Sequence, residues 1–313
     1  MRQVISRFAI VAVLSAAAIM PSAPAFAQTA EAAVADCGVV CAETLFLKAG
    51  AISYAYRTSG PEGETPLILL NRFRGTMDEW DPAFLDRLAT ARHVIIFDSV
   101  GVARTNGTAS EHLSGWAENA ARFIEGLGYE KADILGFSFG GHVAQELTLE
   151  RPELVRRLII VGSGAGYAEG ANLSAKAIEV ATKPVNSDDD FLFLFFRDTP
   201  TSQAAGRAHL ARLRERADAF AATVSAETWK AMLSAGSDVG TAETSLLNRV
   251  GEITQPTLVA NGNEDVMIPT YQSYALAQAI PDARLIIYPD SGHAFMFQYP
   301  ELFEDEVIRF LSE

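Results

Sequence analysis

The chain has 313 residues, 49% apolar and 20% charged, so it is long enough and apolar enough to bury a substantial core. Its 25 basic residues against 39 acidic residues give a formal net charge of −14. This balance disfavours nucleic acid as a partner, because such binding depends on neutralising phosphates. One globular domain with room for an insertion is therefore expected.

The N-terminus has the pattern of a secretory signal peptide over 1–27. Two arginines precede an apolar run over 8–20, and Ala25 and Ala27 supply the small residues of a cleavage site. The apolar run is too short to cross a membrane, which takes about 20 residues. We therefore expect export to the periplasm or the medium, cleavage after Ala27, and no stable membrane anchor in the mature chain.

The only two cysteines, Cys37 and Cys41, lie in a predicted N-terminal arm over 28–43. In an exported protein this spacing allows a local disulfide, which would close a short loop and contribute little stability. Two thiols without a nearby histidine or further cysteine supply only half of a tetrahedral zinc shell, so we expect no metal here. Whether the two thiols are bridged is left open, and a small staple is the simplest interpretation.

A predicted hairpin over 44–57 is followed by short apolar runs that alternate with helical stretches. The runs lie at 67–70, 94–97, 132–135, 158–161, 257–260 and 285–288. They are too short for helices and lack polar alternation, as expected for strands buried on both faces. The stretch 113–127 has one apolar stripe and ends before Gly128, which is typical of a helix. This order predicts an α/β fold with a mainly parallel, doubly wound sheet.

The strand signal disappears between 167 and 251, where alanine, arginine, glutamate and phenylalanine recur at helical spacing. We predict a helical cap over 167–251, inserted into a core formed by 44–166 and 252–313. The segment 191–196 is apolar on every side, so part of it must face the core or a pocket. The acidic run 188–190 is typical of a helix N-terminus.

The strongest local signal is a G-x-S-x-G motif centred on Ser138. It follows the run 132–135 and precedes the helical stretch 142–150. Between a strand and a helix this motif forms a sharp, strained turn that presents the serine, and residues without a Cβ at Gly136 and Gly140 allow the close approach. The motif therefore predicts Ser138 as a nucleophile.

A serine hydroxyl is a poor nucleophile unless a general base takes its proton. Of the five histidines, His293 lies in a loop after the last predicted strand, where a side chain can reach the strand ends. We predict His293 as the base. We interpret His93, His112, His142 and His209 as structural or solvated.

The base needs an acid that holds its tautomer, and the acid is expected between nucleophile and base in chain order. Asp265 fits, because it follows the predicted strand 257–260 directly. Glu264 is the near competitor and Glu169, after the preceding strand, is the distant one. We predict Asp265.

With these motifs in this order, the chain resembles the α/β-hydrolase superfamily from about Thr44 to its C-terminus. The resemblance rests on the elbow at Ser138, on the acid loop with Pro269 four residues after Asp265, and on His293. It implies a serine hydrolase that forms an acyl-enzyme on Ser138 from a small or medium, apolar carboxylic ester or lactone. It implies no cofactor and no metal, and leaves the oligomeric state open.

The resemblance also implies an oxyanion hole made by the backbone N–H groups of Phe73 and Phe139. The chain departs from the family at Asn71-Arg72, where His-Gly is usual. Arg72 or Arg74 is thereby placed to meet a substrate carboxylate or, the interpretation we favour, to brace the loop.

Other functions stay open at this point. A cofactor-free perhydrolase or haloperoxidase would use the same three residues. A hydrolase-like ligand-binding protein would keep the pocket but convert its ligand very slowly. A C–C hydrolase or a hydroxynitrile lyase is less expected. Serine rather than aspartate at 138 argues against dehalogenases and epoxide hydrolases. The glycines at 162–166 resemble a dinucleotide turn, but Tyr167 stands where a glycine is required. Asp98 matches a turn of the family that is usually structural.

Overall fold

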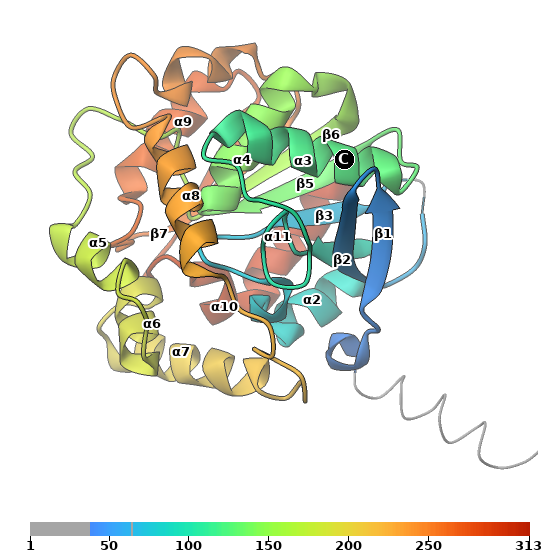
Figure 1. Ribbon diagram of the computed structural model, residues 1–313. Helices are drawn as coiled ribbons and strands as arrows, with labels where there is room; N and C mark the ends of the chain where they lie inside the picture. Colours follow the sequence, from blue (N-terminus) through green and yellow to red (C-terminus); the bar gives the residue numbers. More distant parts are fainter. Residues whose placement is uncertain (1–37, 64) are drawn as a thin grey trace, which may run out of the picture. The chain divides into compact units, whose positions relative to one another are not determined.

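The computed structural model describes residues 38–63 and 65–313 (Figure 1). The predicted signal peptide over 1–27 and Cys37 lie outside these residues, so export and the staple between Cys37 and Cys41 stay predictions. In the described part of the chain, no helix combines the length and the apolar character that a membrane span requires.

One sheet of eight strands forms the centre of the molecule, in the order β1-β2-β4-β3-β5-β6-β7-β8. The strands are β1 (Leu45–Ala49), β2 (Ile52–Ser59), β3 (Leu67–Leu70), β4 (Val94–Phe97), β5 (Ala132–Phe137), β6 (Val155–Val161), β7 (Thr257–Gly262) and β8 (Ala283–Tyr288). Strand β2 pairs antiparallel with β1 and β4, and all other pairs are parallel. The predicted α/β fold class with a mainly parallel sheet is confirmed.

Helices cover both faces of the sheet. They are α2 (Pro82–Ala89), α3 (Leu113–Gly126), α4 (Phe139–Glu150), α5 (Ala175–Ala181), α6 (Asp188–Phe195), α7 (Pro200–Leu213), α8 (Ala226–Ser237), α9 (Thr270–Ala279), α10 (Phe295–Gln298) and α11 (Pro300–Ser312). Leu67 and Leu69 pack into one apolar cluster with α2 and α11, whereas Ile68 packs into another with α3 and α4. Alternate residues of β3 thus face opposite clusters, which explains its unbroken apolar sequence.

Between β6 and β7 the chain forms α5, α6, α7 and α8 and no strand among the described residues. In Figure 1, α5, α6 and α7 gather on the side of the molecule away from β1 and β2. Helix α6 begins at Asp188 with Ser187 as its N-cap, so the acidic run does lie at a helix N-terminus. We use the name cap for 167–251, whose boundaries remain those predicted from the sequence.

The turn from β5 into α4 brings three backbones together. A Cβ atom on Gly136 would lie 2.3 Å from the carbonyl oxygen of Gly140, and one on Gly140 would lie 2.2 Å from that of Leu70 in β3. No real side chain tolerates such distances, so only glycine permits this packing. The turn itself passes through Ser138, whose φ of 54° and ψ of −117° are strained for a residue with a side chain.

We predict that Gly140→Ala lowers the free energy of unfolding by about 3 kcal/mol or more, because α4 must move away from β3. Urea unfolding followed by circular dichroism measures the change. The matched control is Gly236→Ala in α8, where a Cβ would meet nothing within 4 Å. It should raise stability by about 0.5–1 kcal/mol through helix propensity. Equal effects of the two substitutions would contradict the close approach.

Candidate active site

The predicted nucleophile, base and acid lie at the carboxyl ends of three strands in the parallel part of the sheet. Ser138 follows β5, Asp265 follows β7 and His293 follows β8. Ser138 and His293 line the same small cavity of about 30 Å³. Asp265 Oδ2 lies 2.7 Å from His293 Nδ1. The fold therefore brings all three side chains together where open α/β sheets bind ligands.

Asp265 is fixed by its own loop before it meets the histidine. Its Oδ1 accepts hydrogen bonds from the backbone N–H groups of Met267 (2.8 Å) and Ile268 (2.9 Å), which leaves Oδ2 for His293. The alternative acid Glu264 points elsewhere, because its half-exposed carboxylate lies 3.7 Å from Arg197. The distant alternative, Glu169, is exposed.

His293 is buried beside Asp265, which holds the orientation of its ring. In a neutral imidazole, a carboxylate at Nδ1 favours the tautomer with the proton on Nδ1 and the lone pair on Nε2. That Nε2 atom is buried and has no hydrogen-bond partner among the described residues. The rings of Phe137 and Phe195 lie 5.0 and 5.4 Å from the imidazole and exclude water from it. Nε2 is therefore free to accept a proton within the cavity that His293 and Ser138 both line.

The strained turn at Ser138 is held by hydrogen bonds from both sides. Its N–H donates to the carbonyl of Val161 (2.9 Å), and its own carbonyl accepts from Gly141 N–H (2.8 Å) and from Ser163 Oγ (2.8 Å). The side chain is almost fully buried, with 5% exposed. These bonds tie the serine to the end of β6 and explain how a strained backbone persists.

The two predicted oxyanion donors come from different elements. Phe139 is the first residue of α4, so its N–H has no acceptor within the helix. Phe73 lines the cavity of Ser138, and the carbonyl of Arg72 before it accepts a hydrogen bond from Gly75 N–H (3.0 Å). Because N–H and C=O point in opposite directions across a trans peptide, this bond aims the Phe73 N–H away from Gly75. Their roles as oxyanion donors stay predictions.

Both arginines of the Phe73 loop have internal partners. Arg72 is 7% exposed, forms an ion pair with Glu79 and donates from Nη1 to the carbonyl of Phe73 (2.9 Å). Arg74 donates to backbone carbonyls between 181 and 184. These contacts support the bracing interpretation for both side chains.

Asp98 braces the same region from β4. Its carboxylate accepts from the backbone N–H groups of Met77 (2.8 Å) and Arg104 (3.2 Å). Burial raises the pKa of Asp98 to about 6, while these hydrogen bonds act in the opposite direction. The structural role inferred from the sequence agrees with these contacts.

A larger cavity of about 440 Å³ adjoins the small one. The two share Arg72, Arg74, Asn186 and Phe195 as lining residues. The apolar part of the larger wall comes from Phe191, Leu194, Phe195, Leu210, Leu213, Phe220 and Val224. Its volume lies within the range of small-molecule sites. The cap thus supplies apolar side chains to a chamber of mixed polar and apolar lining beside the cavity of Ser138.

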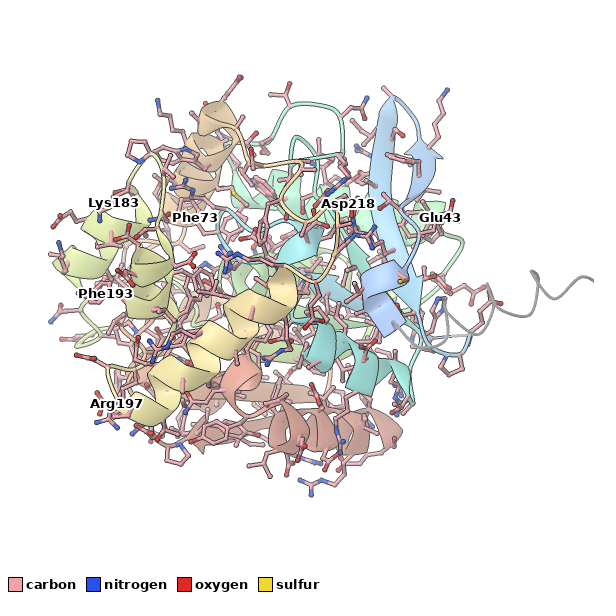
Figure 2. All side chains as sticks on the ribbon, turned by 90° about the horizontal axis from the view of Figure 1, so that it is seen from below. Glu43, Phe73, Lys183, Phe193, Arg197 and Asp218 are labelled. Atoms are coloured by element: carbon pink, nitrogen blue, oxygen red, sulfur yellow. The ribbon has the colours of Figure 1, made fainter. Side chains whose placement is uncertain are left out.

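The side chains of the apolar segment 191–196 face three different surroundings, namely the chamber, the core and the surface. Phe195 packs 6.3 Å from the ring of Phe137, and Phe191 stacks on Phe195 at 4.2 Å. Phe193 is 39% exposed and lies at the outer edge of the molecule in Figure 2. The expectation that part of this segment faces the core or a pocket is confirmed for Phe191 and Phe195.

A second buried histidine–aspartate pair was not found from the sequence. His209 Nδ1 in α7 lies 2.7 Å from Asp81 Oδ2, and Arg212 also donates to this carboxylate. Asp81 is the N-cap of α2, so the cluster joins the cap to the core. His209 stacks on Phe297 at 4.4 Å. We interpret the pair of His209 and Asp81 as structural. The sequence did not predict it, because no local motif relates residues so distant in the chain.

His142 is buried without a partner. Both ring nitrogens lack hydrogen bonds among the described residues, and burial lowers the pKa of His142 to about 4. The imidazole is therefore neutral in the folded protein at neutral pH.

We predict that His142 makes the protein sensitive to acid. The unfolded histidine binds a proton near its ordinary pKa of 6.5, whereas the folded one does so only near 4, so stability falls as the pH falls through this window. The loss is on the order of 3 kcal/mol. His142→Leu should remove this share of the pH dependence of the free energy of unfolding, measured by urea titrations between pH 4 and 7. His112→Leu, at a 75% exposed side chain, is the control and should retain it.

The fold and the geometry at Ser138 define a hydrolase built on a strand–turn–helix elbow. A family model described as the alpha/beta hydrolase fold matches residues 65–300. The chain belongs to this family.

The similar proteins are named as hydrolases of different substrates. 2-Hydroxymuconate semialdehyde hydrolase of Pseudomonas putida is 31% identical over 72% of this chain and 79% of its own length. Poly(3-hydroxyalkanoate) depolymerase of Ectopseudomonas oleovorans is 27% identical over 80% and 85%. A solved structure, an alpha/beta hydrolase fold protein from Chitinophaga pinensis, is 34% identical with a TM-score of 0.79, covering 88% of this chain and 98% of that one. The relatives support hydrolase activity for this chain.

Proposed function

We propose that the protein is a serine hydrolase that cleaves a small or medium, apolar carboxylic ester or lactone. The observation that carries the proposal is the unpartnered Nε2 of His293. This atom is buried in the cavity that Ser138 lines, while Nδ1 of the same ring is held by Asp265. A histidine arranged in this way is suited to take the proton of a serine hydroxyl.

In the proposed reaction, Ser138 Oγ attacks the carbonyl carbon and its proton moves to His293 Nε2. The N–H groups of Phe73 and Phe139 stabilise the oxyanion, and Asp265 stabilises the imidazolium. His293 then gives the proton to the leaving alkoxide, which departs as the alcohol and leaves the acyl group on Ser138. Water attacks the acyl-enzyme by the same route, which releases the acid and restores the serine.

The lining of the chamber favours binding of a neutral, apolar substrate over binding of an anionic one. Each cation on its wall already has a partner: Arg72 is paired with Glu79, Arg214 Nη2 lies 2.7 Å from Asp188 Oδ1, and Arg74 donates to backbone carbonyls. A substrate carboxylate would have to displace one of these partners, whereas an apolar chain gains contact with the phenylalanine and leucine side chains.

We predict that Ser138→Ala lowers kcat/KM for p-nitrophenyl butyrate by at least about 10⁴-fold, because the nucleophile is absent. The melting temperature should stay close to that of the parent. Ser237→Ala, at an exposed serine ending α8, is the control and should retain full activity. Turnover by Ser138→Ala at the parent rate would overturn the assignment.

Covalent labelling separates the alternatives. A fluorophosphonate should label Ser138 in the folded protein, and absence of labelling would favour a ligand-binding protein. Bromination of a dye that depends on peroxide and acetate would favour a perhydrolase.

We predict that Val224→Trp shortens the acyl chain the enzyme accepts, because the new side chain fills part of the chamber. In a panel of p-nitrophenyl esters from acetate to octanoate, kcat/KM for octanoate should fall about tenfold relative to acetate. The control is Leu233→Trp, at a 41% exposed residue of α8 that is not among the residues lining the chamber. An unchanged preference in Val224→Trp would place the acyl chain elsewhere.

A further inference from the structure

We propose that Arg74 is a positioning residue that couples the oxyanion loop, residues 71–76, to the docked cap. The inference rests on the proposed function, because it concerns the orientation of the Phe73 N–H. The reaction rate would then depend on Arg74, a side chain outside the predicted catalytic residues.

The backbone at Arg74 is strained and needs contacts to hold it. Its φ of 58° lies in the left-handed region, which a residue with a Cβ adopts at a cost of about 1–2 kcal/mol. Such a conformation persists where surrounding contacts over-determine it. Here the Arg74 N–H lies 3.4 Å from the sulfur of Met232 in α8, and the guanidinium lies 5.3 Å from the ring of Trp229 in the same helix.

The Arg74 side chain closes the end of the first cap helix. Its Nη1 donates to the carbonyls of Ala181 (3.2 Å) and Lys183 (2.6 Å), and its Nη2 donates to that of Pro184 (3.0 Å). Helix α5 ends at Ala181, and the last carbonyls of a helix lack partners and carry partial negative charge. A cation from the core therefore satisfies a helix terminus of the cap. Figure 2 labels Phe73 and Lys183 on the same side of the view.

The same contact controls the peptide that carries the Phe73 N–H. Arg72 C=O and Gly75 N–H close a tight turn whose two central residues are Phe73 and Arg74. The turn closes only while Arg74 keeps its left-handed conformation. On the other side, Arg72 is held by Glu79, so that half of the loop is anchored in the core. Releasing Arg74 from the carbonyls would open the turn and free the Phe73 N–H to rotate.

Loss of this coupling should appear in kcat, because the oxyanion is present in the transition state and not in the bound ester. We predict that Arg74→Ala lowers kcat about 100-fold, with KM changed less than about threefold. Affinity for a boronic acid, which mimics the tetrahedral intermediate, should fall in parallel. Arg74→Lys keeps the charge and one donor direction and should recover part of the loss.

The matched control is Arg216→Ala. Arg216 also donates to two backbone carbonyls distant in the chain, those of Val40 (2.8 Å) and Ala42 (2.9 Å), but it does not line either cavity at Ser138. It should keep the parent kcat. If Arg74→Ala does not fold, Arg74→Gly tests the same tether, because glycine adopts the left-handed backbone without strain.

Three outcomes would overturn the inference: a rise in KM at constant kcat, an effect no larger than that of Arg216→Ala, or boronic acid affinity that does not follow kcat. In each case Ser138 would still react with a fluorophosphonate. Failure of the proposed function would show differently, as a parent protein without labelling or ester turnover.

Discussion

The contact of three backbones around Ser138 is the constraint on which the site depends. Parallel pairing places Leu70 of β3 beside Gly136 of β5, and Phe137 beside Val161 of β6. The loops that leave these strands must therefore start side by side at one edge of the sheet. Helix α4 can begin there only because Gly140 lets it touch β3. Ser138 and the Phe73 loop are neighbours as a result of strand register.

Around this contact the polar groups are matched before any ligand arrives. Arg72 has Glu79, Asp265 has two backbone N–H groups, and His293 has Asp265. Groups held in this way need little reorganisation when charge develops, which is the condition for electrostatic stabilisation of a transition state. The Nε2 atom of His293 is buried and unpartnered among the described residues, as are the ring nitrogens of His142 and Nε2 of His209, but of these three histidines only His293 lines the cavity with Ser138.

Sequence patterns predicted the features that are local or ordered along the chain. The strands, the elbow and the loops of Asp265 and His293 carry their signal within about ten residues. Strand β6 begins at Val155, earlier than its apolar run, because Val155 already pairs with Ala132 of β5, and the polar side chain of Arg156 is bound there by Asp133. Contacts between segments that are distant in the chain have no such local signal in the sequence. The pair of His209 with Asp81 depends on how α7 docks onto the core, which periodicity does not specify.

Polar contacts outside the predicted catalytic residues join the cap to the core. Asp81 of the core binds His209 and Arg212 of α7, Arg74 closes α5, and Thr228 of α8 donates to the carbonyl of Gly101 (2.7 Å). The chamber wall combines apolar side chains, such as Phe191, Leu194 and Leu213, with polar ones, such as Asn186 and Thr223. Substitutions there would change the volume and shape of the chamber and leave these polar contacts in place. The contacts that join the cap to the core are thus largely separate from the residues that line the chamber, and Arg74 belongs to both sets.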